Sequence, residues 1–407
     1  MKNIVYLYLL MCILAISQFT FAKNPSSKEV MFIVHTETQG GKGVYPIYQE
    51  MKKIGYNVKV VAIPLYNGWY HLPIDKEFME NFDKEDVIYP CGIDEPYTKC
   101  LGIESYKPDY IFVQNPYNAY SNSILDPYFV NTTLKKIAKK IVYIPYGPHI
   151  FHQEFINDKE LPNFVDLVFV DSESTQNIYI EKYGFKKDNV IVSGYYTYKE
   201  IRDIMNNNIK VDRPETILWL PRWTLNFKHR DLFESGSTFL NYHYFFYNYA
   251  LKNPNIHFII RPHPSLLFAI SNQNLLTQEE LDQIFEKFRS LLNVTVSDST
   301  YVPLVNDIMK SDVIISDGTS ALAEVVVADK PIIYLSNGWN NEFNSNKLSK
   351  ELKKYVYLAY SHTEIIDYIG KIRQNNYTLS GNREEFKKIL DPVENPAKFI
   401  AEYLLNN

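Results

Sequence analysis

Cysteine is scarce in this sequence, and its spacing argues against a zinc site. The 407 residues include only three cysteines, at positions 12, 91 and 100, with no Cys-x-x-Cys pair and no Cys/His spacing typical of zinc. Cys12 lies in an apolar leader. Cys91 and Cys100 fit a disulfide in an exported chain and equally two reduced thiols. We therefore expect no bound metal and no cofactor.

An excess of positive charge is also absent. Lys and Arg number 42 against 47 Asp and Glu, which gives a formal net charge of -5. A chain of this charge lacks the basic surface that binds duplex DNA, so we expect no nucleic-acid partner and only local phosphate contacts. The chain is 46% hydrophobic, which at this length is enough for large cores and predicts either two domains or one large one.

Only one long apolar run is present, so a protein with several membrane spans is excluded. The run covers residues 4–22, and Pro25 and two serines break the chain before the first strand. The segment 20–22 reads Thr-Phe-Ala, a small-x-small cleavage site, so residues 1–27 are expected to be a signal peptide or an uncleaved membrane anchor. An anchor would hold the chain at the cytoplasmic face of the inner membrane. Cleavage would place it outside the cell or in a lumen.

After the leader, short β-rich runs alternate with longer amphipathic stretches. This alternation indicates parallel sheets covered by helices on both faces. The expected strands lie at 29–36, 57–64, 108–116, 139–147, 165–172, 189–194, 215–223, 255–264, 293–298, 311–318, 330–335 and 355–361. A polar stretch ending at Pro214 divides them. We therefore expect an α/β fold of two doubly wound, Rossmann-like domains facing a cleft, at 28–210 and 211–385, with a closing helix at 386–407.

Two strands of the second domain are expected to end in basic turns. Arg261 and His263 stand in the sequence "RPHP", where two prolines fix the backbone directly after a buried strand. An Arg fork suits phosphate oxygens and a His can bind phosphate or transfer a proton, although Arg261 could equally pair with a structural carboxylate. Arg222 follows another strand, where it adds positive charge either to the same cleft or to a solvated loop.

Two strands of the first domain also end in candidate site residues. Gly41 and Gly43 precede an expected helix, and glycines there let backbone N–H groups approach a ligand at the helix N-terminus. The spacing is neither G-x-G-x-x-G nor a Walker loop, so this signal is weak by itself. His149 follows the sequence "PYGP" at a third strand end, as a base or as a hydrogen-bonded structural residue.

The sequence "SDGTSALAE" follows the expected strand at 311–318. Asp317 and Gly318 end the strand, and Thr319 or Ser320 is expected to begin a helix, where a small hydroxyl residue caps free N–H groups and suits an anion. Glu324 lies one turn further on, where a carboxylate can accept hydrogen bonds from ribose hydroxyls or act as a partner of the helix dipole. The arrangement predicts a nucleotide site.

Four segments together resemble the CDP-glycerol glycerophosphotransferases of teichoic-acid-type polymer synthesis. They read "ILWLPRWT", "FIIRPHP", "SDVIISDGTSALAE" and "YGFKKDNVIVSGYY", and the resemblance covers most of residues 165–340. It implies a GT-B fold, an N-terminal acceptor domain and a C-terminal domain that binds a CDP-activated donor. In this reading Arg261 and His263 contact the donor pyrophosphate, and Glu324 faces the ribose. Asp317, Thr319 and Ser320 would line the nucleotide loop.

The chain departs from the family at the catalytic base. The family has a His-Gly pair after a strand, whereas this chain has Tyr146-Gly147 and then His149 two residues later. The resemblance therefore implies that His149 takes the proton from a hydroxyl of a cell-surface glycan or polyol phosphate, while His263 stabilises the departing nucleotide. No Asp-x-Asp metal signature is evident.

Two other functions are compatible with the same features. A GT-B glycosyltransferase that uses a UDP- or CMP-sugar would need the same C-terminal loop. An exported two-lobed binding protein, or an inactive relative, would agree better with a cleaved leader, because nucleotide donors are normally supplied in the bacterial cytoplasm.

Overall fold

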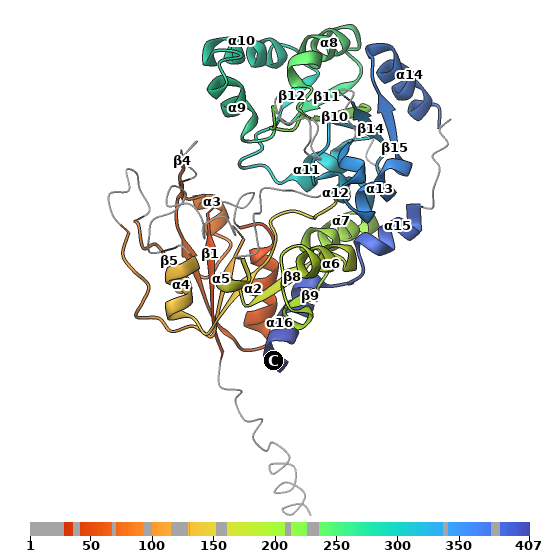
Figure 1. The fold of residues 1–407 in the computed structure, drawn as a ribbon. Coiled ribbons are helices and arrows are strands. Elements are labelled where there is room, and N and C mark those ends of the chain that lie inside the picture. Colours follow the sequence, from red (N-terminus) through yellow and green to blue (C-terminus); the bar gives the residue numbers. More distant parts are fainter. Residues whose placement is uncertain are drawn as a thin grey trace, which may run out of the picture.

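The computed structural model contains two parallel sheets, one after the other along the chain (Figure 1). The part of the chain that carries the first sheet is called the first half, and the part that carries the second sheet is called the second half. The described residues are 28–35, 41–66, 71–92, 100–114, 129, 131–151, 161–207, 213–225, 236–336, 341–375 and 383–407. The expected signal peptide or anchor at 1–27 lies outside them. Within the described ranges, no helix has the length and apolar character needed to cross a bilayer.

The first sheet has seven strands in the order β5-β2-β1-β6-β7-β8-β9, and its paired strands run parallel. The strands are β1 Glu29–Val34, β2 Asn57–Ala62, β5 Val87–Ile88, β6 Tyr110–Val113, β7 Lys140–Tyr143, β8 Leu167–Val170 and β9 Val190–Val192. The strand order reverses between β1 and β6, and in open α/β sheets the crevice at such a reversal is the usual ligand position.

Helices cover this sheet on both faces. They are α2 Val44–Lys53, α3 Lys76–Met79, α4 Asn131–Ile137, α5 Leu161–Phe164 and α6 Glu173–Glu181, with the short helix η3 Lys187–Asn189 and a hairpin of β3 Leu65–Tyr66 and β4 His71–Leu72. The next helix, α7 Tyr196–Asn207, follows β9, and its buried side chains lie in an apolar cluster with strands of the second sheet. The starts of these helices follow local capping rules. At α6, for example, the Ser172 side chain accepts a hydrogen bond from the Thr175 N–H, which satisfies one of the free amides at the helix N-terminus.

The second sheet has six parallel strands in the order β12-β11-β10-β13-β14-β15. The strands are β10 Thr216–Leu220, β11 His257–Ile260, β12 Val294–Val296, β13 Val313–Ser316, β14 Ile332–Leu335 and β15 Val356–Ala359. The helices are α8 Phe239–Lys252, α9 Leu266–Asn272, α10 Gln278–Arg289, α11 Leu304–Lys310, α12 Leu322–Val327, α13 Lys347–Leu352, α14 His362–Arg373, α15 Arg383–Leu390 and α16 Pro396–Asn406, with η4 Asn341–Asn344 and η5 Lys353–Tyr355. These two parallel α/β sheets confirm the fold class predicted from the sequence.

The last helix returns to the first sheet. Figure 1 shows α16 beside α2, away from the other helices at the C-terminal end of the chain. Ala397, Ile400 and Leu404 are buried in the same apolar cluster as the α2 side chains. Lys28 Nζ also donates to the main-chain oxygen of Leu405, 3.3 Å away, and a cation at a helix C-terminus is stabilised by the helix dipole.

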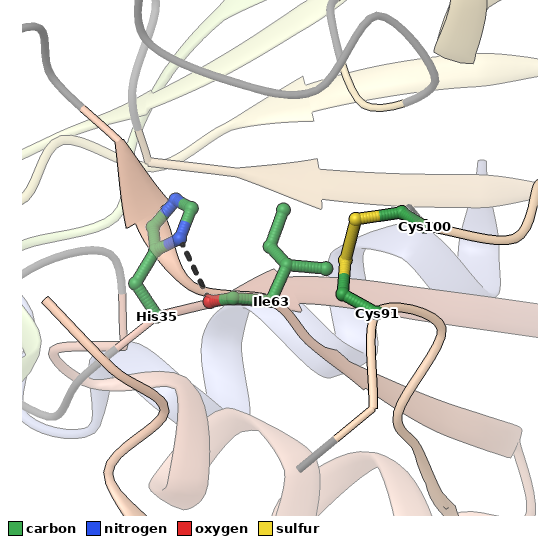
Figure 2. The surroundings of a disulfide bond; sticks show 4 residues. All are labelled: His35, Ile63, Cys91 and Cys100. Carbon is green, nitrogen blue, oxygen red and sulfur yellow. Dashed lines mark hydrogen bonds between the residues drawn. A yellow bond between two sulfur atoms is a disulfide. The ribbon is translucent and has the colours of Figure 1, made fainter. Parts of the chain in front are cut away.

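The two cysteines that the sequence left undecided form a disulfide. Cys91 and Cys100 are nine positions apart and both are buried. Figure 2 shows their bridge near Ile63, whose side chain belongs to the same apolar cluster. On the other side of Ile63, the His35 ring donates from Nδ1 to the Ile63 carbonyl oxygen at 3.2 Å. Burial lowers the pKa of His35 to about 4, so this ring is neutral at physiological pH.

Candidate functional site

The carboxyl ends of the two sheets meet where the sequence predicts a ligand. Lys42 at the start of α2 and Thr197 at the start of α7 both reach Glu324 in α12. Gly147, after β7, lies so close to the second half that an added Cβ would stand 3.1 Å from Ser320 Oγ. Segments that follow strands of both sheets therefore lie close together here, at the position where open α/β sheets usually bind ligands. We call this region the cleft.

Glu324 is the central acidic residue of this cleft. Its side chain is 2% exposed, and its Oε1 accepts from Lys42 Nζ at 3.0 Å and from Thr197 Oγ1 at 2.9 Å. Within the described part of the chain, Oε2 accepts no hydrogen bond. A carboxylate with one oxygen outside these hydrogen bonds can accept a hydrogen bond from a ligand hydroxyl. The ribose contact predicted for Glu324 remains a prediction, and its position is compatible with it.

The backbone around Lys42 is held by side chains of the first half. Gln114, after β6, donates from Nε2 to the Lys42 carbonyl oxygen at 2.6 Å and to the Tyr196 hydroxyl at 3.2 Å. The Tyr196 hydroxyl in turn donates to the Pro145 carbonyl oxygen at 3.1 Å. The Lys42 ammonium also lies 5.4 Å from the centre of the Tyr195 ring, a cation–π distance. These contacts join the ends of β1, β6, β7 and β9.

The two glycines beside Lys42 have different roles in the structure. Gly43 caps α2 with φ 74°, and a Cβ there would lie 2.0 Å from Tyr196 Cδ2. Glycine is thus required by the approach of the Tyr196 ring and by the left-handed backbone. The Gly41 carbonyl oxygen accepts from the Val44 N–H at 3.0 Å. Phosphate binding by Gly41 and Gly43 stays a prediction.

Asp317 holds loops of the second half together. It is fully buried, and Oδ1 accepts from the Arg222 N–H at 2.6 Å, while Oδ2 accepts from the N–H and the hydroxyl of Thr238 at 2.7 and 2.9 Å. Burial raises the pKa of Asp317, and these hydrogen bonds oppose that shift. The contacts favour a structural role, because both carboxylate oxygens already serve the protein.

The turn after Asp317 differs from the predicted helix start. Gly318 has φ 95°, and a Cβ there would lie 2.4 Å from the Tyr334 hydroxyl, so only glycine fits. The helix α12 begins at Leu322, later than expected, and has no side-chain cap. Thr319 Oγ1 instead accepts from the Ala321 N–H at 2.9 Å. The predicted N-cap at Thr319 or Ser320 is therefore wrong, because the hydroxyl closes a tight turn before the helix.

Arg261 makes its hydrogen bonds inside the protein. Its side chain is 7% exposed and donates from Nη1 to Asp307 Oδ2 at 2.8 Å and to Ser297 Oγ at 3.3 Å. Nη2 donates to the main-chain oxygens of Ser299 and Val302 at 3.4 and 2.7 Å. These partners favour the structural alternative weighed for Arg261. The predicted contact with the donor pyrophosphate would have to use its Nε or replace one of these acceptors.

His263 has a neutral ring with one N–H donor. Its Nδ1 accepts from the Ser265 N–H at 3.1 Å, so the proton of the neutral ring is on Nε2. Burial lowers the pKa of His263 to about 3, and the positive charges of Arg222 and Arg261 add to the effect. A neutral ring with an N–H donor suits an anionic oxygen.

Arg222 is mostly buried, and its Nε donates to Thr224 Oγ1 at 3.0 Å.

His149 points into the first half. Its Nε2 lies 3.3 Å from the Tyr179 hydroxyl, its backbone N–H donates to Asp171 Oδ2 at 3.3 Å, and its buried Nδ1 has no partner among the described residues. Burial lowers the pKa of His149 to about 4. A neutral ring is a possible proton acceptor chemically, but this one is enclosed by protein. These contacts favour the structural alternative, and catalysis by His149 stays a prediction.

Sequence reasoning missed three residues at the cleft. Lys42 and Thr197 bond to Glu324, Gln114 holds the Lys42 backbone, and only the glycines beside Lys42 gave a local signal. Their partners are 72 to 282 positions away, a distance over which no local pattern operates. Among the described residues, no group of three or more His, Cys, Asp or Glu side chains is arranged to hold a metal ion.

Solved structures with a similar architecture include several UDP-GlcNAc 2-epimerases. The enzyme of Neisseria meningitidis, bound to UDP-GlcNAc, is 16% identical with a TM-score of 0.56, over 93% of this chain and 100% of that one. The enzyme of Methanocaldococcus jannaschii, in complex with UDP-GlcNAc and UDP, is 14% identical with a TM-score of 0.56 over the same shares. That of Rickettsia bellii is 14% identical with a TM-score of 0.53, over 93% and 95%.

The fold is GT-B-like. At these identities the likeness establishes the fold alone. No protein-family model and no curated protein matches the sequence. The resemblance to CDP-glycerol glycerophosphotransferases is therefore supported only in its GT-B fold, because the similar solved structures are UDP-GlcNAc 2-epimerases.

Proposed function

We propose that the chain is a nucleotide-sugar-dependent enzyme of glycosyltransferase type that binds a UDP-sugar between its two sheets. The observation that carries this proposal is the buried carboxylate of Glu324, which follows β13 at the carboxyl edge of one sheet and faces donors from the other. The related folds named above include complexes with UDP-GlcNAc and UDP, which supports a uridine nucleotide as the ligand class.

The cleft residues supply the interactions that such a ligand needs. Glu324 Oε2 would accept a hydrogen bond from a ribose hydroxyl. The neutral His263 would donate from Nε2 to a phosphate oxygen and so stabilise charge on the departing nucleotide. Donors placed before the reaction, in a site closed to water, stabilise developing charge without reorganisation, which is the usual origin of large rate effects.

Transfer of glycerol phosphate from a CDP-activated donor is a second candidate. The "RPHP" and "SDGTSALAE" segments favour it, because they resemble the glycerophosphotransferase motifs and both follow strands of the second sheet. Both candidates use the same nucleotide cleft and differ in the donor. The acceptor that we propose for either is a hydroxyl of a glycan or a polyol phosphate.

A donor screen separates the candidates. UDP-GlcNAc, UDP-glucose, a CMP-sugar and CDP-glycerol are titrated into the protein at equal concentrations, and nucleotide release is measured with glycan acceptors. We expect a UDP-sugar to bind most tightly. A preference for CDP-glycerol would favour glycerophosphate transfer, and binding of none would contradict both enzymes.

Two substitutions link the screen to the cleft. Glu324→Gln should weaken UDP-sugar binding about tenfold or more, because it removes a charge-assisted hydrogen bond. His263→Ala should lower nucleotide release more than binding. The control is His257→Ala, at the opposite end of the same strand β11, which should leave both unchanged.

A further inference from the structure

The ion pair of Lys42 and Glu324 lies at the border between the protein interior and the cleft. Its charged atoms are 3.0 Å apart, and the two side chains are 19% and 2% exposed. Removing two charges from water costs about as much as their attraction returns, so a buried pair rarely gives much net stability. Because this pair joins the two halves at the expected ligand position, we considered a role in ligand binding.

Both donors to Glu324 come from the first half and use the same oxygen. Lys42 Nζ and Thr197 Oγ1 donate to Oε1, and Oε2 has no hydrogen-bond partner among the described residues. A ribose carries two neighbouring hydroxyl donors. Lys42 and Thr197 thus donate hydrogen bonds to Glu324 as the ribose hydroxyls of a nucleoside would.

The Lys42 side chain can move while its backbone stays in place. Gln114 Nε2 fixes the Lys42 carbonyl oxygen at 2.6 Å, and Gly43 begins α2 directly afterwards. The ammonium is tied by Glu324 and the face of Tyr195, and it is the partly exposed member of the pair. Rotation about its side-chain bonds can move the ammonium off Glu324 without any change of fold.

A nucleoside diphosphate carries hydroxyls and negative charge on adjacent groups. When the ribose hydroxyls bind to Glu324, a displaced lysine keeps its charge and needs a new anion nearby. The diphosphate is covalently attached to the ribose, so it is held within reach of the same lysine. A flexible ammonium is well suited to such a change of partner.

We propose that Lys42 exchanges partners on ligand binding. It neutralises Glu324 when the cleft is empty and pairs with the diphosphate when a nucleoside diphosphate is bound. This inference rests on the proposed function. It adds a contact between Lys42 and the diphosphate, and it requires that the nucleotide displace Lys42 from Glu324.

The test compares UDP with uridine by titration calorimetry on wild type and Lys42→Met. Uridine presents the ribose without phosphates. The variant should bind UDP about tenfold or more weakly, from loss of a charge-assisted contact, and uridine as tightly as wild type or more tightly, because Glu324 is freed. Lys42→Arg should bind UDP with an affinity within a few-fold of that of wild type.

Thr197→Val is the matched control, since it removes the other donor to the same oxygen without removing charge. It should change UDP and uridine affinity by the same factor. Equal losses of UDP and uridine affinity in Lys42→Met, or an undiminished UDP affinity, would overturn the exchange while the nucleotide site stands. If wild type binds neither ligand, the proposed function and the exchange both fail.

Discussion

Gly43 offers a sharp test of how the first half is packed. Gly43→Ala should destabilise the protein more than Gly55→Ala, although both residues have left-handed backbone, with φ 74° and 93°. The backbone cost is common to both, about 1–2 kcal/mol. Of the two, only Gly43 brings the new Cβ against another group, at 2.0 Å from Tyr196 Cδ2, whereas no atom of the described residues lies within 4 Å at Gly55.

Overpacking of a buried ring adds about 1–3 kcal/mol at Gly43. The expected loss in free energy of unfolding is therefore about 2–5 kcal/mol for Gly43→Ala and about 1–2 kcal/mol for Gly55→Ala. Urea unfolding followed by circular dichroism measures both. Repeating the pair in a Tyr196→Ala background should remove the difference, because the clashing ring is gone. Equal losses for the two alanine variants in the wild-type background would refute the packing argument.

Three further outcomes follow from buried groups. Asp307→Asn should cost about 3–5 kcal/mol in urea unfolding because it leaves Arg261 without its buried partner, whereas Arg289→Gln, in an exposed pair, should cost less than about 1 kcal/mol; similar losses would contradict the structural role of Arg261. Burial lowers the pKa of His149 from 6.5 to about 4, so the unfolded chain binds the proton first as pH falls. The free energy of unfolding of wild type should then drop about 3 kcal/mol more than that of His149→Gln between pH 7 and 4, and parallel profiles would show that His149 is not held neutral. Reduction of the Cys91–Cys100 bridge should cost about 2.5 kcal/mol, from the entropy of the closed loop, and a reductant should have no such effect on a Cys91→Ser/Cys100→Ser variant.

Local patterns were enough to predict most of the fold. Strands such as Ile332–Leu335 and Thr216–Leu220 are buried apolar runs bounded by polar or turn residues, which is the signal of a parallel strand. The strands β3, β4 and β5 escaped prediction because each has only two residues, as in Val87–Ile88. A run of two residues has no periodicity to detect.

The site was less predictable, since its chemistry depends on partners far apart in the sequence. Glu324 could be picked out because a strand end and a helix start frame it locally. The sequence of "RPHP" could not show that Arg261 pairs with Asp307, 46 positions later. Nor could it show that Lys42 reaches Glu324 across 282 positions. Which of several charges meet is decided by tertiary packing alone.

A crystal structure of the protein soaked or grown with UDP tests the central claim most directly. We expect the nucleotide between the two sheets, with a ribose hydroxyl bonded to Glu324 and a phosphate oxygen near His263 and Lys42. UDP bound elsewhere on the molecule, or in the cleft with its ribose away from Glu324, would contradict the account.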